Sequence, residues 1–117
     1  MEEIFNFNFL LNLLMNDEEA TKELLKSYLA QTKQHIASLE SIIKDASSFE
    51  EKREAIRKEA HLLKGSSLNV SAKDFASIML ELEKSSHSIS QEDATKLFSL
   101  AVEKWKTLQK EIKKTLS

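Results

Sequence analysis

Residues 54–68 read E-A-I-R-K-E-A-H-L-L-K-G-S-S-L, and this stretch has the pattern of one amphipathic helix. Apolar or small side chains recur at spacings of three and four, at Ile56, Ala60 and Leu63, and they predict the face that packs into a core. At about 100° per residue, His61 falls on the opposite side of the helix, so we expect its ring to be exposed. The stretch also holds Gly65, the only glycine in a chain without proline.

The segments on either side repeat this pattern, and together they predict four long helices. Their expected bounds are near 17–46, 49–68, 72–86 and 91–115. Polar residues that can cap a helix, each followed by acids, mark the four starts: Asn16-Asp17 with Glu18 and Glu19, Ser48 with Glu51, Ser71 with Asp74, and Ser90 with Asp93. Four single-faced helices joined by short turns predict an all-α fold, an antiparallel up-down-up-down four-helix bundle.

One domain over residues 1–117 accounts for the whole chain, with the bundle at about 17–115. The shared phase of the apolar stripes predicts one core that contains Leu25, Ile36, Leu39, Ile56, Leu63, Phe75, Met79, Phe98 and Trp105. Ahead of the bundle, residues 5–9 alternate like a strand, but Asn8 could equally cap a short helix that ends at Met15. We predict the short helix, at about 8–15, because a lone strand would lack a ladder partner.

Composition narrows the classes of function. The net charge of −2 weighs against a nucleic-acid or membrane binder, which would usually carry a clear basic excess. The chain has no cysteine, so disulfides and thiolate chemistry are excluded. Residues 1–5 are acidic and aromatic rather than basic, and no apolar run is long enough to span a bilayer, so we expect a cytoplasmic protein.

His61 has an unusual setting on its helix face. Three cations lie near it at spacings of three and four, and Leu68 follows two turns later; the cations are Arg57, Lys58 and Lys64. A solvated helix face would explain the cations but not Gly65, which costs about 0.5–1 kcal/mol inside a helix. Gly65 could instead end the helix at Lys64 as a C-cap, and this alternative stays open. An exposed imidazole beside cations and a residue without a side chain fits a phosphoryl acceptor.

The block Ala60–Ser67, A-H-L-L-K-G-S-S, resembles the signature of histidine-containing phosphotransfer (HPt) domains. The resemblance continues to Leu82-Glu83 and reaches back through residues 16–18 and 24–29. It implies that His61 is phosphorylated, that Lys64 neutralises the phosphoryl group and that Gly65 lets a receiver domain dock. Glu83 falls where the family often has Gln or Glu near the histidine. One departure is Ser71, which stands where the family has a later glycine; as a helix cap, a serine there is comfortable.

The resemblance also implies partners and chemistry. It implies a monomer that relays phosphoryl groups between response-regulator receiver domains, supplied by a hybrid sensor kinase, with Mg²⁺ bound by the receiver and no cofactor bound by this domain. The docking surface would comprise Arg57, Lys58, Gly65, Leu68 and Glu83. A chain with one glycine cannot build a phosphate-cradling loop, so we do not expect a kinase or another enzyme.

Two alternatives remain. One is a helical interaction module without phosphorylation, which would bind its partner through the face around Leu68. The other is an HPt domain of a larger kinase, against which Met1 and the single-domain length weigh. Of the other histidines, we expect His35 to be packed at the edge of an apolar stripe and His87 to be solvated in a Ser-rich turn. No histidine pair has metal-ligand spacing, so no metal site is predicted.

Overall fold

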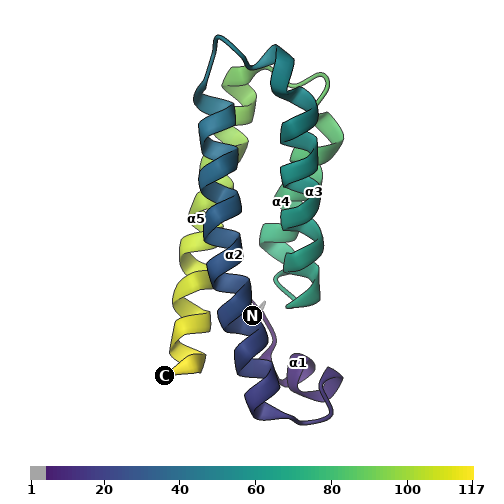
Figure 1. Cartoon of the computed structure of the whole chain (residues 1–117), viewed down its shortest axis with the longest axis vertical. Helices are drawn as coiled ribbons and strands as arrows, with labels where there is room; N and C mark the ends of the chain where they lie inside the picture. Colours follow the sequence, from purple (N-terminus) through teal and green to yellow (C-terminus); the bar gives the residue numbers. More distant parts are fainter. Residues whose placement is uncertain (1–4) are drawn as a thin grey trace.

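Helices account for nearly all of residues 5–117, the part of the chain that the computed structural model describes (Figure 1). They are α1 (Phe7–Leu13), α2 (Glu18–Lys44), the 3-10 turn η1 (Glu50–Lys52), α3 (Arg53–Asn69), α4 (Lys73–Ser85) and α5 (Gln91–Leu116). No strand occurs in residues 5–117, and no helix there is long and apolar enough to cross a membrane. Residues 1–4, on which the expectation about the N-terminus partly rests, lie outside this range.

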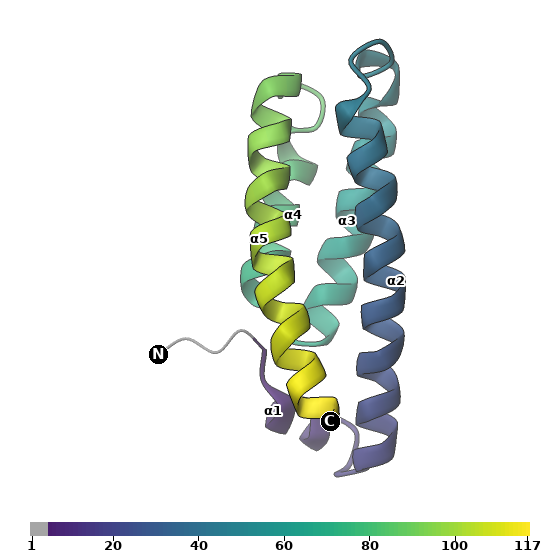
Figure 2. The same cartoon turned by 90° about the vertical axis from the view of Figure 1, so that its left-hand side faces the viewer.

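The four long helices form a closed ring of neighbours. α2 packs on α3, α3 on α4, α4 on α5, and α5 returns to α2. Consecutive helices run in opposite directions, as Figures 1 and 2 show. The predicted all-α, up-down-up-down four-helix bundle is therefore confirmed. α1 packs against α2 at the end of the bundle where α2 begins.

One hydrophobic core runs along the bundle. Eight of the nine residues predicted for it are buried in it, and Ile36 is partly buried and packs against it. Trp105 is 6% exposed; its ring lies 5.9 Å from the ring of Tyr28 and 6.0 Å from that of Phe75. Because these aromatic rings come from α5, α2 and α4, their contacts tie three of the four helices together.

Two of the four predicted helix caps are confirmed. The Asp17 side chain accepts a hydrogen bond from the backbone N–H of Ala20, and Ser90 accepts one from that of Asp93. The predicted cap at Ser48 is wrong, because its hydroxyl donates to Asp45 Oδ2 at 2.7 Å. The chain continues from there through η1 into α3, which starts without a side-chain cap.

Ser71 ends α3 instead of starting α4, so the predicted cap at this residue is also wrong. Its φ is 61°, in the left-handed region that favours glycine. The N–H of Ser71 donates to the carbonyl of Leu68, and that of Ala72 donates to the carbonyl of Ser67, which together form a Schellman motif. The Ser71 hydroxyl accepts a 2.7 Å hydrogen bond from the N–H of Asn6. The backbone thus explains why a glycine suits this position.

The predicted N-terminal helix exists, and the strand alternative for residues 5–9 is wrong. Asn6 rather than Asn8 caps it, by accepting from the N–H of Phe9 at 2.9 Å. The helix ends at Leu13, two residues before the predicted end, because Met15 takes a φ of 57° that a helix cannot continue.

Candidate functional site

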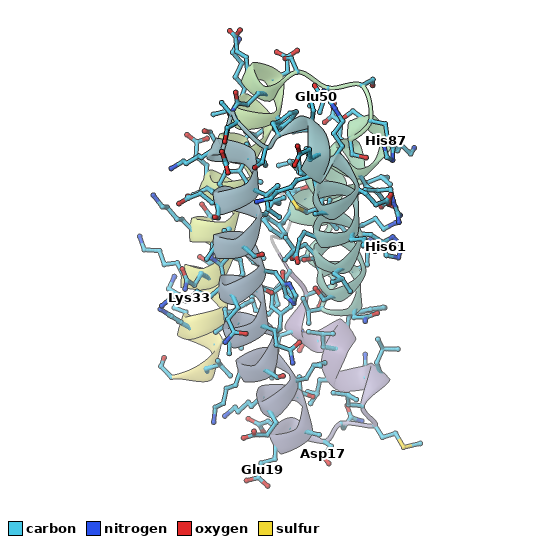
Figure 3. All side chains as sticks on the ribbon, turned by 45° about the horizontal axis from the view of Figure 1, so that its top comes forward. Asp17, Glu19, Lys33, Glu50, His61 and His87 are labelled. Atoms are coloured by element: carbon cyan, nitrogen blue, oxygen red, sulfur yellow. The ribbon has the colours of Figure 1, made fainter. Side chains whose placement is uncertain are left out.

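α3 presents His61 on its outer face. The His61 side chain is 58% exposed, whereas Ile56, Ala60 and Leu63 on the opposite face are at most 1% exposed. Figure 3 shows His61 projecting from α3 away from the bundle. The prediction that this ring is exposed is confirmed.

Glu83 joins His61 to Lys64. Its Oε2 lies 3.0 Å from His61 Nδ1, and its Oε1 lies 2.9 Å from the ammonium nitrogen of Lys64. The Lys64 contact is an ion pair. His61 and Lys64 lie one turn apart on α3, and Glu83 reaches them from α4, where its side chain is 18% exposed. The packing of α4 on α3 therefore builds this three-residue cluster.

The charge on Glu83 determines which ring nitrogen of a neutral His61 carries the proton. The Lys64 ammonium, and to a lesser degree the contact with His61, holds the pKa of the Glu83 carboxyl below its ordinary value, although desolvation acts in the opposite direction. The carboxylate is therefore ionised at neutral pH and can only accept hydrogen bonds. A neutral His61 then carries its proton on Nδ1 and donates it to Glu83, an assignment that follows from the hydrogen-bond network. This leaves the lone pair of Nε2 free.

Gly65 lies inside α3, four residues before its end, so the C-cap alternative is wrong. Its φ is not in the left-handed region. A Cβ added at Gly65 would have no atom within 4 Å apart from the helix's own adjoining backbone. Neither the backbone conformation nor the local packing requires a glycine here. Because Gly65 has no side chain, it leaves a bare patch of helix one turn after His61.

The other residues of the predicted docking surface lie along the same face but differ in their surroundings. Arg57 is half-buried and pairs with Glu54 one turn before it. Lys58 is exposed, and Leu68 is 52% exposed. The pairing of Arg57 means that the predicted row of cations is partly neutralised within α3.

The remaining histidines differ from each other. His35 on α2 is 39% exposed, and its Nδ1 lies 2.7 Å from Oε2 of Glu59 on α3. The prediction of a packed His35 is therefore wrong in part, because the ring is half-exposed and held by a carboxylate. His87 is 65% exposed, with Nε2 3.8 Å from Oε2 of Glu54, as expected for a solvated residue.

Sequence reasoning missed a groove beside the site. It lies between α2 and α3, has a volume of about 210 Å³, and is lined in part by Leu24, Tyr28, His35 and Leu62. Leu62, the residue after His61, is 52% exposed. Its position off the apolar stripe of α3 was the available signal, because a large apolar residue on a solvated face has no core to fill.

In this helical bundle the Glu83 carboxylate thus lies between an exposed histidine and a lysine. Comparison with known families agrees: the family model described as Hpt domain matches residues 23–115, and the chain belongs to this family. Hpt domains carry phosphoryl groups in phosphorelays, interact with the receiver domains and kinases of two-component systems, and are not enzymes in the usual sense.

A solved structure has the same fold. The chain is similar to histidine-containing phosphotransfer protein B (HptB) from Pseudomonas aeruginosa PAO1, with a TM-score of 0.85 and 21% sequence identity over 99% of this chain and 96% of that chain. At this identity the likeness shows the fold alone. Comparison with curated protein sequences gives no significant match.

Proposed function

We propose that His61 accepts a phosphoryl group from the aspartyl phosphate of one receiver domain and passes it to the aspartate of another. The observation that carries this proposal is the 58% exposure of His61 together with the contact of its Nδ1, at 3.0 Å, with a Glu83 carboxylate that also pairs with Lys64. It orients the ring and leaves Nε2 as the nucleophile on an exposed face.

In the transfer step, the lone pair of His61 Nε2 attacks phosphorus. A bond forms between Nε2 and phosphorus while the bond from phosphorus to the aspartyl oxygen breaks, and its electron pair stays on the receiver's carboxylate. The ring retains its Nδ1 proton and becomes cationic, and Glu83 lies 3.0 Å away to stabilise that charge. The reverse reaction returns the phosphoryl group to an aspartate. Mg²⁺ would belong to the receiver, and we propose no cofactor for this chain.

Lys64 offsets negative charge at the site. In this structure its ammonium lies 2.9 Å from Oε1 of Glu83, so it neutralises the carboxylate that would otherwise repel an incoming phosphoryl group. One turn from His61, the same ammonium can also approach the transferred group. Lys64 thus supports the transfer without forming the new bond.

The surface around His61 suits an acidic receiver site that carries a phosphoryl group. Lys58 adds an exposed positive charge beside Arg57, Leu68 adds apolar area, and the bare helix at Gly65 allows close approach. We propose that these residues and Glu83 form the docking surface for receiver domains and for a hybrid sensor kinase. The carrier would act as a monomer, since one bundle contains every residue of the site.

The test is transfer from a phosphorylated receiver domain to the purified chain, with labelling measured after acid and base treatment. The wild-type chain should gain acid-labile, base-stable label, as expected for the phosphorus–nitrogen bond of phosphohistidine. His61→Gln should gain none. Phosphoramidate, a small donor that needs no docking, should also label His61. Label that persists in His61→Gln, or that maps to His35 or His87, would contradict the assignment. If neither donor labels the wild-type chain, the non-phosphorylated interaction module is the better account.

A further inference from the structure

Lysines gather in two segments of the chain, on α2 and α5. Residues 22–33 hold three lysines and one glutamate, and residues 104–114 hold five lysines and one glutamate. The two segments together contribute +6 to a chain whose net charge is −2, so the rest of the chain carries −8. The net charge that weighs against a membrane binder is therefore an average over two parts of opposite sign.

On α2, the lysines lie on the side that borders α5. The groove between α2 and α3 is lined in part by Leu24 and Gln31. Lys26 and Lys33 each follow one of these residues by two positions, which is about 200° around the helix. Lys22 lies one turn before Lys26 and shares its face. Because α2 packs on α3 on one side and on α5 on the other, this row of lysines borders α5.

On α5, a second row lies on the side that borders α2. Lys104 and Leu108 line a small hollow between α4 and α5. Lys106 and Lys110 each follow one of these residues by two positions and so point away from α4, and Lys113 lies one turn after Lys110. These last three lysines, with a threonine and a glutamine, line a shallow hollow of about 450 Å³. The two rows are therefore side by side on the bundle.

Together the two rows form a basic face, which comprises Lys22, Lys26, Lys33, Lys106, Lys110 and Lys113. Five of these side chains are exposed and that of Lys22 is half-exposed. Lys22 and Lys26 pair with Glu18 and Glu23 at 3.5 and 3.6 Å, but ion pairs with such exposed glutamates are weak. For the other four lysines, no carboxylate of residues 5–117 lies within ion-pair distance. The positive charge of the face is thus largely available to a partner.

We propose that the basic face binds the anionic surface of a phospholipid bilayer, with the bundle lying on its side. The contact would be peripheral, since no helix of residues 5–117 is long and apolar enough to cross a membrane. Figure 3 shows Lys33 and His61 on opposite sides of the bundle. A chain bound in this way would leave His61 open, so this inference goes beyond the proposed phosphotransfer and does not depend on it.

The chemistry of the basic face favours a bilayer over a protein partner. Its cations are all lysines, and the two arginines of the chain, Arg53 and Arg57, lie on α3. Interfaces between proteins are enriched in arginine, which binds carboxylates in a fixed bidentate geometry, and are depleted in lysine. A lysine ammonium is a strongly hydrated point charge, which suits the diffuse field of many lipid phosphates.

The shape of the basic face favours a plane over a strand of nucleic acid. Lys22 and Lys33 lie eleven positions apart, which is about 16 Å along α2, and the axes of packed helices are about 8–10 Å apart. Two parallel rows at this spacing make a broad patch rather than a single track for one strand. Tyr28 and Trp105, the aromatic side chains of the two segments, are buried, so bases would have no ring to stack on.

The experiment measures co-sedimentation of the full chain with vesicles of phosphatidylcholine alone and of phosphatidylcholine with about one-third phosphatidylserine, at about 0.05 and 1 M salt. The basic-face variant combines Lys106→Glu, Lys110→Glu and Lys113→Glu. The matched control combines Lys52→Glu, Lys73→Glu and Lys84→Glu, which change the net charge equally at exposed lysines outside the basic face. Circular dichroism checks the fold of each variant, and phosphoramidate labelling checks His61.

We expect the wild-type chain to bind the phosphatidylserine vesicles at low salt and to lose this binding at high salt, where charges are screened. It should not bind phosphatidylcholine alone. Each lysine close to an anionic bilayer strengthens binding about fivefold, so the basic-face variant should bind about 100-fold more weakly, whereas the control should stay within about threefold of wild type.

Three results would each overturn the inference: no binding of the wild-type chain to phosphatidylserine vesicles, equal losses in the two variants, or tighter binding to a duplex DNA fragment at the same phosphate concentration. Equal losses would mean that net charge matters and the face does not. Labelling of His61 by phosphoramidate should be the same in all three proteins. A wild-type chain that binds vesicles but is never labelled would contradict the proposed function and leave this inference intact.

Discussion

Two histidines in this bundle are held in the same way by a glutamate from the adjacent helix. His61 Nδ1 lies 3.0 Å from Glu83, and His35 Nδ1 lies 2.7 Å from Glu59. The surroundings differ. Glu83 also pairs with Lys64, whereas no lysine or arginine lies within ion-pair distance of Glu59 among residues 5–117. A carboxylate that orients an imidazole is therefore present at both places and cannot by itself distinguish an acceptor.

His61 differs from His35 in how accessible its ring is and in the charged groups around it. Its side chain is 58% exposed, against 39% for His35. Gly65 leaves the helix bare one turn away, and Lys64 offsets the charge of the carboxylate. His35 instead faces a groove lined by neutral side chains. Access and charge therefore distinguish the proposed acceptor His61 from His35, although a glutamate holds both rings.

The sharpest test of this comparison is a matched pair of substitutions. His61→Gln should reduce phosphoryl incorporation more than 100-fold, because the nucleophilic nitrogen is lost, whereas His35→Gln should keep incorporation at saturating receiver. Phosphoryl incorporation is measured with a labelled, phosphorylated receiver domain as the donor and, separately, with phosphoramidate. Equal losses in the two variants would remove the distinction between the pairs.

Trp105 stabilises the helical bundle that holds both histidine–glutamate pairs. Trp105→Ala should reduce the free energy of unfolding by about 3–5 kcal/mol, because the ring is 6% exposed and packs on Tyr28 and Phe75. Urea denaturation followed by circular dichroism measures the change. A loss below about 1 kcal/mol would show that the ring contributes little to the core.

The two glutamates should also differ. In Glu83→Gln the amide oxygen can still accept from Nδ1, but the negative charge is lost, so kcat for transfer to His61 should fall about tenfold. Glu59→Gln should leave kcat within about twofold, because Glu59 contacts His35 and not His61. Single-turnover transfer at saturating receiver separates kcat from docking. A similar fall in both variants would indicate a general effect of charge.

Acid should weaken the Glu83 cluster in a defined direction. The pKa of Glu83 lies below its ordinary value of 4.5, chiefly because of Lys64. Its contribution to stability is therefore fully present above pH 4.5 and is lost as the pH falls through the lower folded-state value. The difference in free energy of unfolding between wild type and Glu83→Gln should therefore shrink as the pH falls below 4.5. A difference that grows below pH 4.5 would contradict the assigned ion pair.

Gly65 should show the smallest effect on stability. Gly65→Ala should raise the free energy of unfolding by about 0.5–1 kcal/mol, because the site is helical and an added Cβ has open space. Gly65→Gln should keep the fold but slow transfer from a receiver, while phosphoramidate labelling continues. Thermal denaturation of the alanine variant is decisive, since a loss of stability would mean that the helix needs a glycine there.

Much of the fold was predictable because the evidence for it is local. Apolar spacing placed Ile56, Ala60 and Leu63 inside and His61 outside, and both placements are confirmed. Helix starts were less predictable. A serine followed by an acid is compatible with a cap, but Ser48 and Ser71 have other hydrogen-bond partners, Asp45 in one case and Asn6 in the other. The Asn6 partner lies 65 residues from Ser71, beyond the reach of any local pattern.

The candidate site likewise has features that were predictable within one helix and contacts that depend on how the helices pack. Repeating patterns within one helix bring His61, Lys64 and Gly65 together, because residues three and four apart share a face. Glu83 was expected near His61 only through the family resemblance, and its contact across 22 residues depends on how α4 packs on α3. The contact of His35 with Glu59 and the groove beside Leu62 likewise exist only once α2 and α3 are side by side. Periodicity determines which face of a helix is buried, but the rotation and offset between packed helices determine which side chains meet across them.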